Sequence, residues 1–292
     1  MKIAVFGKEF KSEFKENFEE FYHFLKSRNV ETIFYKKFYH FLRDQFDLKL
    51  DIKGIFESYE DLKNEFDLMA SIGGDGTFLE AVTFVRDSKI PLLGINSGRL
   101  GFLATISREE ITSTLQSFFN QEYSLESRSL IKIDSSPESF NGYHCGLNEA
   151  AVQKSGSNMI TIHVFVDNEL LNSYWADGLL VATPTGSTAY SLSVGGPILS
   201  PESNNFIISP IAPHTLTIRP VVIPDSHEIR LKVESRDSKF IASLDQRHEY
   251  FDTDQELVIN RSNYSINLVR FNNISYYQTL RNKLMWGNDR RN

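Results

Sequence analysis

A short apolar run that passes directly into a glycine-rich loop constrains the fold of this chain more than any other feature. The run covers residues 67–72, the loop is GGDGT over residues 73–77, and a helical stretch continues to residue 86. A strand that enters a helix through such a loop is the repeating unit of a parallel sheet with helices on its faces. The sequence therefore predicts an α/β domain around residues 73–77.

The chain on either side of this loop repeats the alternation. Phe14, Phe18, Phe21 and Leu25 recur at steps of four, three and four, which places them on one helical face. A capping box at residues 107–110 predicts the start of a further helix. Strand-like apolar runs lie at residues 2–7, 32–35 and 90–96.

The pattern of the chain changes after residue 120. Residues 160–166 alternate apolar and polar side chains, Asp167 and Asn168 mark a turn, and residues 170–175 return, which predicts a hairpin. Short strands with intervening turns are typical of an antiparallel β domain. Further strands are expected at residues 228–233, 240–244, 256–260 and 266–269, and a final helix at 276–285. We place an α/β domain over residues 1–105 and a mostly-β domain over residues 106–268.

Composition and charge exclude several classes of protein. The 292 residues include 31 Lys and Arg against 38 Asp and Glu, a net charge of −7, without the clustered basic residues of a nucleic-acid-binding protein. No stretch approaches the roughly 18 apolar residues of a membrane helix, and the first apolar run is too short for a signal peptide. Because Cys145 is the single cysteine, no intrachain disulfide is possible. We expect a cytoplasmic protein that binds neither nucleic acid nor membrane.

The glycine loop has the properties of a phosphate site, with one exception. Glycines let the backbone approach a ligand closely, and successive N–H groups ahead of a helix attract an anion. Asp75 lies inside that loop, where a carboxylate repels phosphate by about 1 kcal/mol in water at about 4 Å. Such a group accepts a proton from an attacking hydroxyl or holds a divalent cation beside the phosphates. The alternative is an ordinary turn with Asp75 as the helix N-cap.

A second candidate segment, residues 183–193, is rich in hydroxyl groups. Six hydroxyl side chains besides that of Tyr190 lie within eleven residues. They suit a polyhydroxyl ligand such as a nucleotide ribose, and a tyrosine ring suits a base. A solvated surface loop would have the same composition. The nearby pair Asn148 and Glu149, ahead of an apolar run, lies either at an exposed edge or in a site.

A third candidate segment, residues 96–103, follows the strand expected at 90–96. Ligands of open parallel sheets bind beyond the carboxyl ends of the strands, so this segment and the Asp75 loop are expected to line one crevice. We predict no metal-binding residues, because four histidines lack metal-ligand spacing and fit ordinary hydrogen-bonded side chains. These are His144, His163, His214 and His248.

Together these segments resemble the NAD kinase family, over nearly the whole chain. The glycine–aspartate loop alone is shared with phosphofructokinases and lipid kinases, whereas the hydroxyl-rich segment and the Asn-Glu pair are specific. The matching signatures are residues 73–77, 101–103, 148–149, 177–178, 183–193, 195–197, 213–216 and 245–246.

This resemblance implies a fold and a reaction. The implied fold is an α/β N-terminal domain with a parallel sheet and an all-β, β-sandwich C-terminal domain, with a C-terminal helix in residues 269–292 returning to the first domain. The implied reaction transfers the γ-phosphoryl group of ATP to the adenosine ribose 2′-hydroxyl of NAD and gives NADP. A divalent cation, usually Mg²⁺, accompanies ATP. Members are usually cytoplasmic homo-oligomers, dimers or tetramers.

The roles implied by the resemblance centre on Asp75, the expected proton acceptor for the 2′-hydroxyl. Asn148 and Glu149 are expected to hydrogen-bond base and sugar groups of the dinucleotide, and Asp177 to hold a polar edge of NAD. Tyr190 would stack on the ligand. The other expected contacts, through backbone or side chain, are Gly73, Gly74, Gly76, Thr188, Ala189, Ser191, Leu192, Ser193, Ala212 and Gln246.

Two positions depart from the common bacterial pattern, and two rival functions stay open. Trp175 stands where many relatives have an arginine, and Asn158 where some have a histidine, so charge near a phosphate-bearing ligand is lost. A lipid kinase of the diacylglycerol or sphingosine kinase type shares the glycine loop but usually carries a PxGTGN stretch where this chain has residues 96–102. A non-catalytic NAD sensor would keep the fold without turnover, although a pure binder gains nothing from Asp75.

Overall fold

The computed structural model describes the chain except for residues 64–65, 99, 272–274 and 288–292. The chain forms two compact units, the first comprising Met1–Ser127 and Ile266–Asn292 and the second Arg128–Ser265. This division differs from the expected boundary near residue 105, because helix α4 (Ile111–Phe119) buries its apolar face in the core of the first unit. Two long strands, β6 (Ser124–Asp134) and β17 (Leu257–Arg270), carry the chain between the units.

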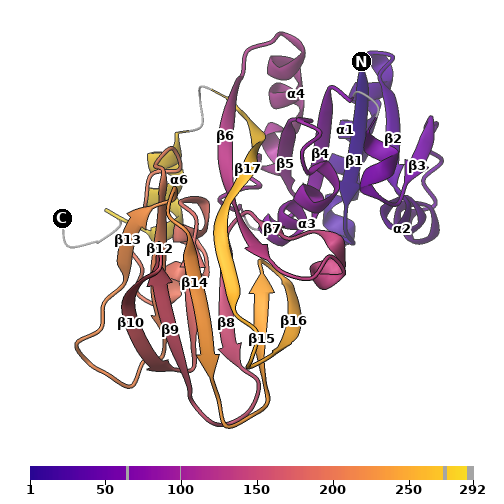
Figure 1. Cartoon of the computed structure of the whole chain (residues 1–292). Helices are drawn as coiled ribbons and strands as arrows, with labels where there is room; N and C mark the ends of the chain where they lie inside the picture. The colour runs from indigo at the N-terminus through magenta and orange to yellow at the C-terminus, as the bar shows by residue number, and fades with distance from the viewer. Residues whose placement is uncertain (64–65, 99, 272–274, 288–292) are drawn as a thin grey trace. The chain divides into compact units, whose positions relative to one another are not determined.

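The first unit is built on a parallel sheet (Figure 1). The strand order is β17–β5–β4–β1–β2–β3, and each neighbouring pair is parallel. Every residue of β4 and β5 is buried, as expected for strands covered on both faces. The strands that complete this sheet are β1 (Lys2–Gly7), β2 (Glu31–Tyr35), β3 (Gly54–Phe56), β4 (Leu68–Gly73) and β5 (Leu92–Asn96).

Helices α1, α3 and α4 of this unit form where the sequence predicts them. The stripe of Phe14, Phe18, Phe21 and Leu25 is buried in the core, and the predicted capping box ahead of α4 is present. Of the helices that the structure describes, none is both long enough and apolar enough to cross a bilayer. Besides α4, the helices of this unit are α1 (Lys15–Ser27), α2 (Lys36–Phe46), α3 (Asp75–Val85) and α6 (Tyr276–Leu284).

The second unit consists mainly of antiparallel strands in two sheets. One has the order β10–β9–β14–β17, and the other β13–β12–β11–β8–β15–β16. The expected hairpin is confirmed as β9 and β10, whereas the two strands expected at 256–260 and 266–269 are wrong, because β17 runs through both. Beyond β6 and β17, the elements are β7 (Cys145–Gly146), β8 (Glu149–Lys154), β9 (Ile160–Val166), β10 (Glu169–Ala176), β11 (Gly178–Ala182), α5 (Tyr190–Ser193), β12 (Asn205–Ile211), β13 (Val221–Pro224), β14 (Ile229–Glu234), β15 (Lys239–Leu244) and β16 (Arg247–Asp252).

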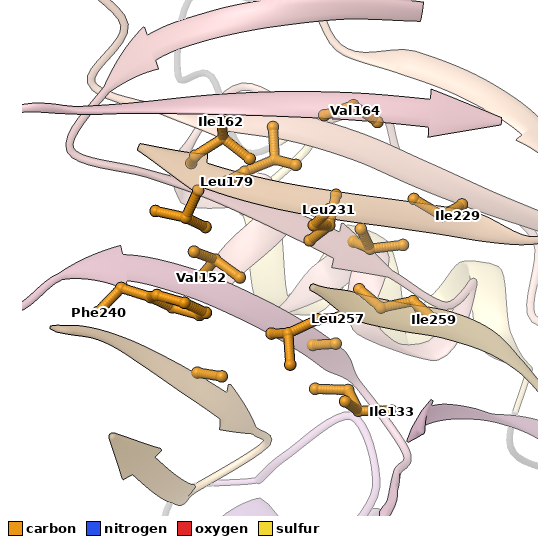
Figure 2. Close-up of a cluster of buried hydrophobic side chains, with 14 of the residues drawn as sticks. Ile133, Val152, Ile162, Val164, Leu179, Ile229, Leu231, Phe240, Leu257 and Ile259 are labelled. Atoms are coloured by element: carbon orange, nitrogen blue, oxygen red, sulfur yellow. The ribbon is translucent and has the colours of Figure 1, made fainter. Parts of the chain in front are cut away.

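The two sheets of the second unit share one apolar core. Figure 2 shows Ile162 and Leu231 on one sheet facing Val152, Leu179 and Phe240 on the other, and all five are at most 1% exposed. Alternate residues of each strand point into this layer, as in a β-sandwich. The predicted fold class, an α/β domain followed by a β-sandwich domain and a C-terminal helix, is confirmed.

Candidate functional site

Asp75 is the first residue of α3, and only Gly74 separates it from Gly73 at the end of β4. Gly73 has a φ of 155°, and a Cβ at this position would lie 2.3 Å from Oγ1 of Thr77, so the turn requires glycine. Gly74 is the N-cap residue of the helix. The interpretation of Asp75 as the N-cap is therefore wrong, and its carboxylate has other partners.

The Asp75 carboxylate accepts three backbone hydrogen bonds from the loop that follows β5. The N–H of Phe102 donates to Oδ2 at 2.8 Å, and those of Leu103 and Ala104 donate to Oδ1 at 2.9 Å. Gly101 lies against the same group, since a Cβ there would be 1.8 Å from Oδ1. An ionised carboxylate has about four acceptor positions. Among the residues that the structure describes, these three donors leave one acceptor position of Asp75 open, on Oδ2.

The sheet explains why these two loops meet. β4 and β5 are parallel neighbours, with Gly73 opposite Asn96 at their carboxyl ends, and Ser97 N–H donates to the Gly73 carbonyl at 3.3 Å. These contacts place the described residues of 96–103 beside the glycine loop, and the crevice that the two loops are expected to line stays a prediction. Within this loop, Gly98 N–H donates to Oδ1 of Asn96 at 2.7 Å, which holds the turn in shape.

Asn148 and Glu149 occupy the entrance to β8 in the second unit. β8 lies between β11 and β15, so the alternative of an exposed edge is wrong. Asn148 is 8% exposed, and Oε2 of Glu149 is buried without a hydrogen-bond partner among the described residues. Burial, followed by the negative charge of Asp245, raises the pKa of Glu149 to about 8.

Asp245, which the sequence indicates only as part of the matching signature at residues 245–246, holds the backbone of that entrance. Its Oδ2 accepts from Leu147 N–H at 2.8 Å, and its Oδ1 accepts from Asn148 N–H at 2.8 Å and from Glu149 N–H at 3.2 Å. Burial raises the pKa of Asp245, while these amides and the Arg247 guanidinium lower it. The sequence signals for Asp245 are the matching signature at residues 245–246 and its place directly after the strand expected at 240–244.

Part of the hydroxyl-rich segment serves the fold. Thr183 Oγ1 donates to the carbonyl of Leu147 at 2.6 Å, and Ser187 Oγ donates to that of Pro184 at 2.6 Å. Ser191 is different, because its Oγ is buried and has no partner in the part of the chain that the structure describes. The segment beyond Ser187 is more open, and the Tyr190 side chain is 37% exposed.

Asp177 and Ala212 lie at the other end of the same strands. In the register of β8 and β11, Ala182 pairs with Glu149 and Gly178 pairs with Gln153. A rise of about 3.3 Å per residue puts Asp177 roughly 16 Å from Glu149 along the sheet. Asp177 pairs with Lys154 at 2.6 Å, and its N–H donates to Ile211, next to Ala212. Within one chain, the second unit does not bring Asp177 and Glu149 together.

Two family models match the chain, one in each half. The ATP-NAD kinase N-terminal domain matches residues 3–123, and the ATP-NAD kinase C-terminal domain matches residues 147–271. The chain belongs to the ATP-NAD kinase family. Curated proteins named NAD kinase from Flavobacterium johnsoniae and Cytophaga hutchinsonii are each 44% identical to it over 100% of both chains.

Solved structures of this family have the same fold. Yeast NADH kinase complexed with NADH matches with a TM-score of 0.86 and 26% identity, over 100% of this chain and 89% of that chain. An NAD kinase from Archaeoglobus fulgidus in complex with ATP matches with a TM-score of 0.73 and 28% identity, over 98% of this chain and 99% of that one. Both likenesses extend over both units, so they do not depend on one domain.

The two departures from the common ATP-NAD kinase pattern lie on the surface of the second unit. Trp175 is 48% exposed, its ring centroid lies 4.4 Å from that of His214, and its carbonyl accepts from His214 N–H at 3.0 Å. Asn158 is exposed in the turn before β9. An aromatic pair therefore stands beside the Asp177 end of the strands, where the common pattern has an arginine.

Proposed function

We propose that this protein transfers the γ-phosphoryl group of ATP to the adenosine ribose 2′-hydroxyl of NAD and gives NADP. The 44% identity over the full length of proteins named NAD kinase supports this reaction over that of a lipid kinase or a non-catalytic NAD sensor. Likeness to kinase structures that hold NADH or ATP supports the same substrates. The observation that carries the mechanism is the Asp75 carboxylate at the start of α3, with an acceptor position left on Oδ2.

In the proposed mechanism Asp75 acts as the general base. Oδ2 accepts the proton of the 2′-hydroxyl as the ribose oxygen forms a bond to the γ-phosphorus, and the bond from that phosphorus to the oxygen of ADP breaks. A base in this position contributes about 10²–10⁴ in rate. The backbone of Gly73, Gly74 and Gly76 and the N-terminus of α3 would hold phosphate oxygens. The three amides on Asp75 fix its direction before the substrate arrives.

The divalent cation, Mg²⁺ in this proposal, arrives with ATP as part of the substrate. Among the residues that the structure describes, no group of three or more His, Cys, Asp or Glu is arranged to hold a metal ion. Mg²⁺ is commonly bound through substrate phosphates with few protein ligands. Phosphate oxygens of ATP would therefore supply most of its coordination.

The dinucleotide would form hydrogen bonds with buried polar atoms of the second unit that have no partner among the described residues. These atoms are Glu149 Oε2 and Ser191 Oγ. Buried polar atoms without a hydrogen-bond partner are uncommon in folded proteins. Asn148 would bond a base or sugar group, and Tyr190 would stack. Backbone or side-chain contacts are also proposed for Asp177, Thr188, Ala189, Leu192, Ser193, Ala212 and Gln246.

We further propose a cytoplasmic homo-oligomer. β10 ends the order of its sheet, and Leu170 and Trp175 on it are 53% and 48% exposed. An apolar edge strand favours association with another chain. In the proposed homo-oligomer, a second copy supplies Asp177 to the dinucleotide site. This would explain why Asp177 and Glu149 lie far apart within one chain. Light scattering of the purified protein tests the assembly, and a monomer at micromolar concentration would reject it.

The reaction is tested by an end-point assay with NAD, ATP and Mg²⁺, coupled to an NADP-specific dehydrogenase. The proposal expects NADP to accumulate in proportion to enzyme. A parallel assay offers diacylglycerol vesicles and radiolabelled ATP. Label in the lipid fraction would favour the lipid kinase, and NAD binding by calorimetry without any product would favour the sensor.

A further inference from the structure

The backbone of residues 147–149 is held on both sides by two residues. The N–H groups of Leu147, Asn148 and Glu149 all donate to the Asp245 carboxylate, at 2.8, 2.8 and 3.2 Å. The carbonyl of Leu147 accepts from Thr183 Oγ1 at 2.6 Å and that of Asn148 accepts from Thr183 N–H at 2.8 Å. The carbonyl of Glu149 accepts from Asp245 N–H at 3.0 Å. All six backbone polar groups are therefore bonded to Asp245 or Thr183.

Asp245 adopts a backbone conformation that glycine would reach more easily. It lies in the two-residue turn between Leu244 and Arg247, which pair across β15 and β16, and its φ is 53°. Glycine is favoured where the first turn residue of a hairpin has a positive φ. A non-glycine residue in this conformation is strained. Glycine would relieve the strain, but it has no carboxylate to accept the three backbone N–H groups.

Two glycines let the neighbouring chain segments come this close. A Cβ at Gly186 would lie 2.1 Å from the Asn148 carbonyl oxygen, and one at Gly146 would lie 3.1 Å from Oδ1 of Asp245. The segment therefore fits between the loop that carries Thr183 and the turn that carries Asp245. Its backbone is satisfied, whereas Oε2 of Glu149 stays buried without a partner among the described residues.

We propose that Asp245 and Thr183 are positioning residues, which fix the backbone of residues 147–149 so that the Asn148 and Glu149 side chains face the dinucleotide. This inference rests on the proposed function, in which those two side chains bind NAD. A misplacement of about 1 Å of a positioned group lowers the rate of a reaction that depends on it by about 100-fold. Neither positioning residue needs to touch the ligand.

The test compares NAD affinity in the full-length chain by calorimetry, with steady-state KM values for NAD and ATP beside it. Asp245→Asn replaces one acceptor oxygen by a donor, and Thr183→Val removes the hydroxyl at nearly constant shape. Each should weaken NAD binding about 10- to 100-fold while the KM for ATP stays unchanged. Thr183→Ser keeps the hydroxyl and should retain wild-type affinity. Asp254→Asn, at an exposed position in the same unit, is the matched control.

The outcomes separate this inference from the proposed function. A wild-type protein that binds NAD but makes no NADP rejects the proposed reaction, whereas the calorimetric comparison still judges the positioning residues. Wild-type NAD affinity in a folded Asp245→Asn or Thr183→Val protein overturns the positioning role. An equal loss for NAD and ATP, or a loss in Thr183→Ser as large as in Thr183→Val, overturns it too. If Asp245→Asn does not fold, the two Thr183 variants decide.

Discussion

Asp75 in the first unit and Asp245 in the second accept the same kind of hydrogen bonds, but they hold backbone segments of different character. Each carboxylate accepts three N–H groups from consecutive residues, Phe102 to Ala104 for Asp75 and Leu147 to Glu149 for Asp245. In the first unit the held segment is apolar, and the carboxylate is the group that we propose as the general base. In the second unit the held segment carries the polar pair, and the carboxylate supports it.

This difference indicates that an aspartate with three amide donors has no fixed role. Asp75 begins a helix, where the positive end of the helix dipole stabilises an anion. Asp245 stands in a hairpin turn beside Glu149, whose pKa is raised by burial and then by the negative charge of Asp245. In the proposed function, the first arrangement fixes the direction of a reacting carboxylate, and the second fixes a backbone segment that binds the dinucleotide.

Replacing Asp75 is expected to have the largest effect. Asp75→Asn keeps one oxygen for the Leu103 and Ala104 amides but sets an NH2 group against Phe102 N–H and removes the base. We expect kcat to fall by about 10²–10⁴, while NAD affinity stays near the wild-type value because Asn148 and Glu149 are unchanged. Steady-state kinetics and calorimetry measure the two quantities separately. Asp44→Asn, which removes an exposed partner of Arg43, should change neither. Full turnover in Asp75→Asn would remove this residue from the mechanism and break the contrast with Asp245.

Replacing Glu149 is expected to change how stability depends on pH. Because the folded chain raises the pKa of Glu149 from 4.5 to about 8, it binds a proton that the unfolded chain releases within that window. The free energy of unfolding therefore falls as pH rises from about 4.5 to about 8, by an amount on the order of a few kcal/mol. Glu149→Gln mimics the neutral form and should flatten this slope. Denaturant titrations at several pH values check it, and an unchanged slope would contradict the buried carboxyl pair.

The sequence predicts the fold wherever the spacing of side chains decides it. Continuous apolar runs identify β1 and β4, because these strands are buried on both faces. β3 is missed, since only Phe56 of its three residues is buried and no run exists to find. β17 reads as two strands because residues 261–265 interrupt the apolar alternation, with Ser262 the one buried residue among them.

The sequence predicts the site only where a side chain carries the signal. Asp75 is recognisable inside its glycine loop, but its partners are backbone amides 27 to 29 residues away, which any residue except proline could supply. Asp245 accepts from residues up to 98 positions away, so the signature at residues 245–246 marks the aspartate but does not indicate which backbone it holds. The hydroxyl-rich segment suggests a ligand, yet Thr183 and Ser187 use their hydroxyls within the fold.

Replacing Gly101 tests how rigidly Asp75 is held. In Gly101→Ala the added Cβ would lie 1.8 Å from Oδ1 of Asp75, so the loop or the carboxylate must move. We expect a loss of about 1–3 kcal/mol in the free energy of unfolding, together with a large loss of turnover. Gly98→Ala is the matched control in the same loop, because nothing lies within 4 Å of its Cβ position. Thermal unfolding and kcat measure both variants, and wild-type behaviour of Gly101→Ala would show that the loop yields easily.

Replacing Gly146 makes the same test on Asp245, with the smallest expected effect. In Gly146→Ala the added Cβ would lie 3.1 Å from Oδ1 of Asp245 and 3.2 Å from the Glu149 carbonyl, so a shift of a few tenths of an ångström relieves the contact. The loss of freedom in the unfolded chain offsets part of the strain, by about 0.4–1 kcal/mol. Stability should therefore change by less than about 1 kcal/mol, and NAD affinity by about two- to threefold. A loss as large as that of Gly101→Ala would mean that both carboxylates are held with equal rigidity, although the added Cβ comes less close to Asp245 than to Asp75.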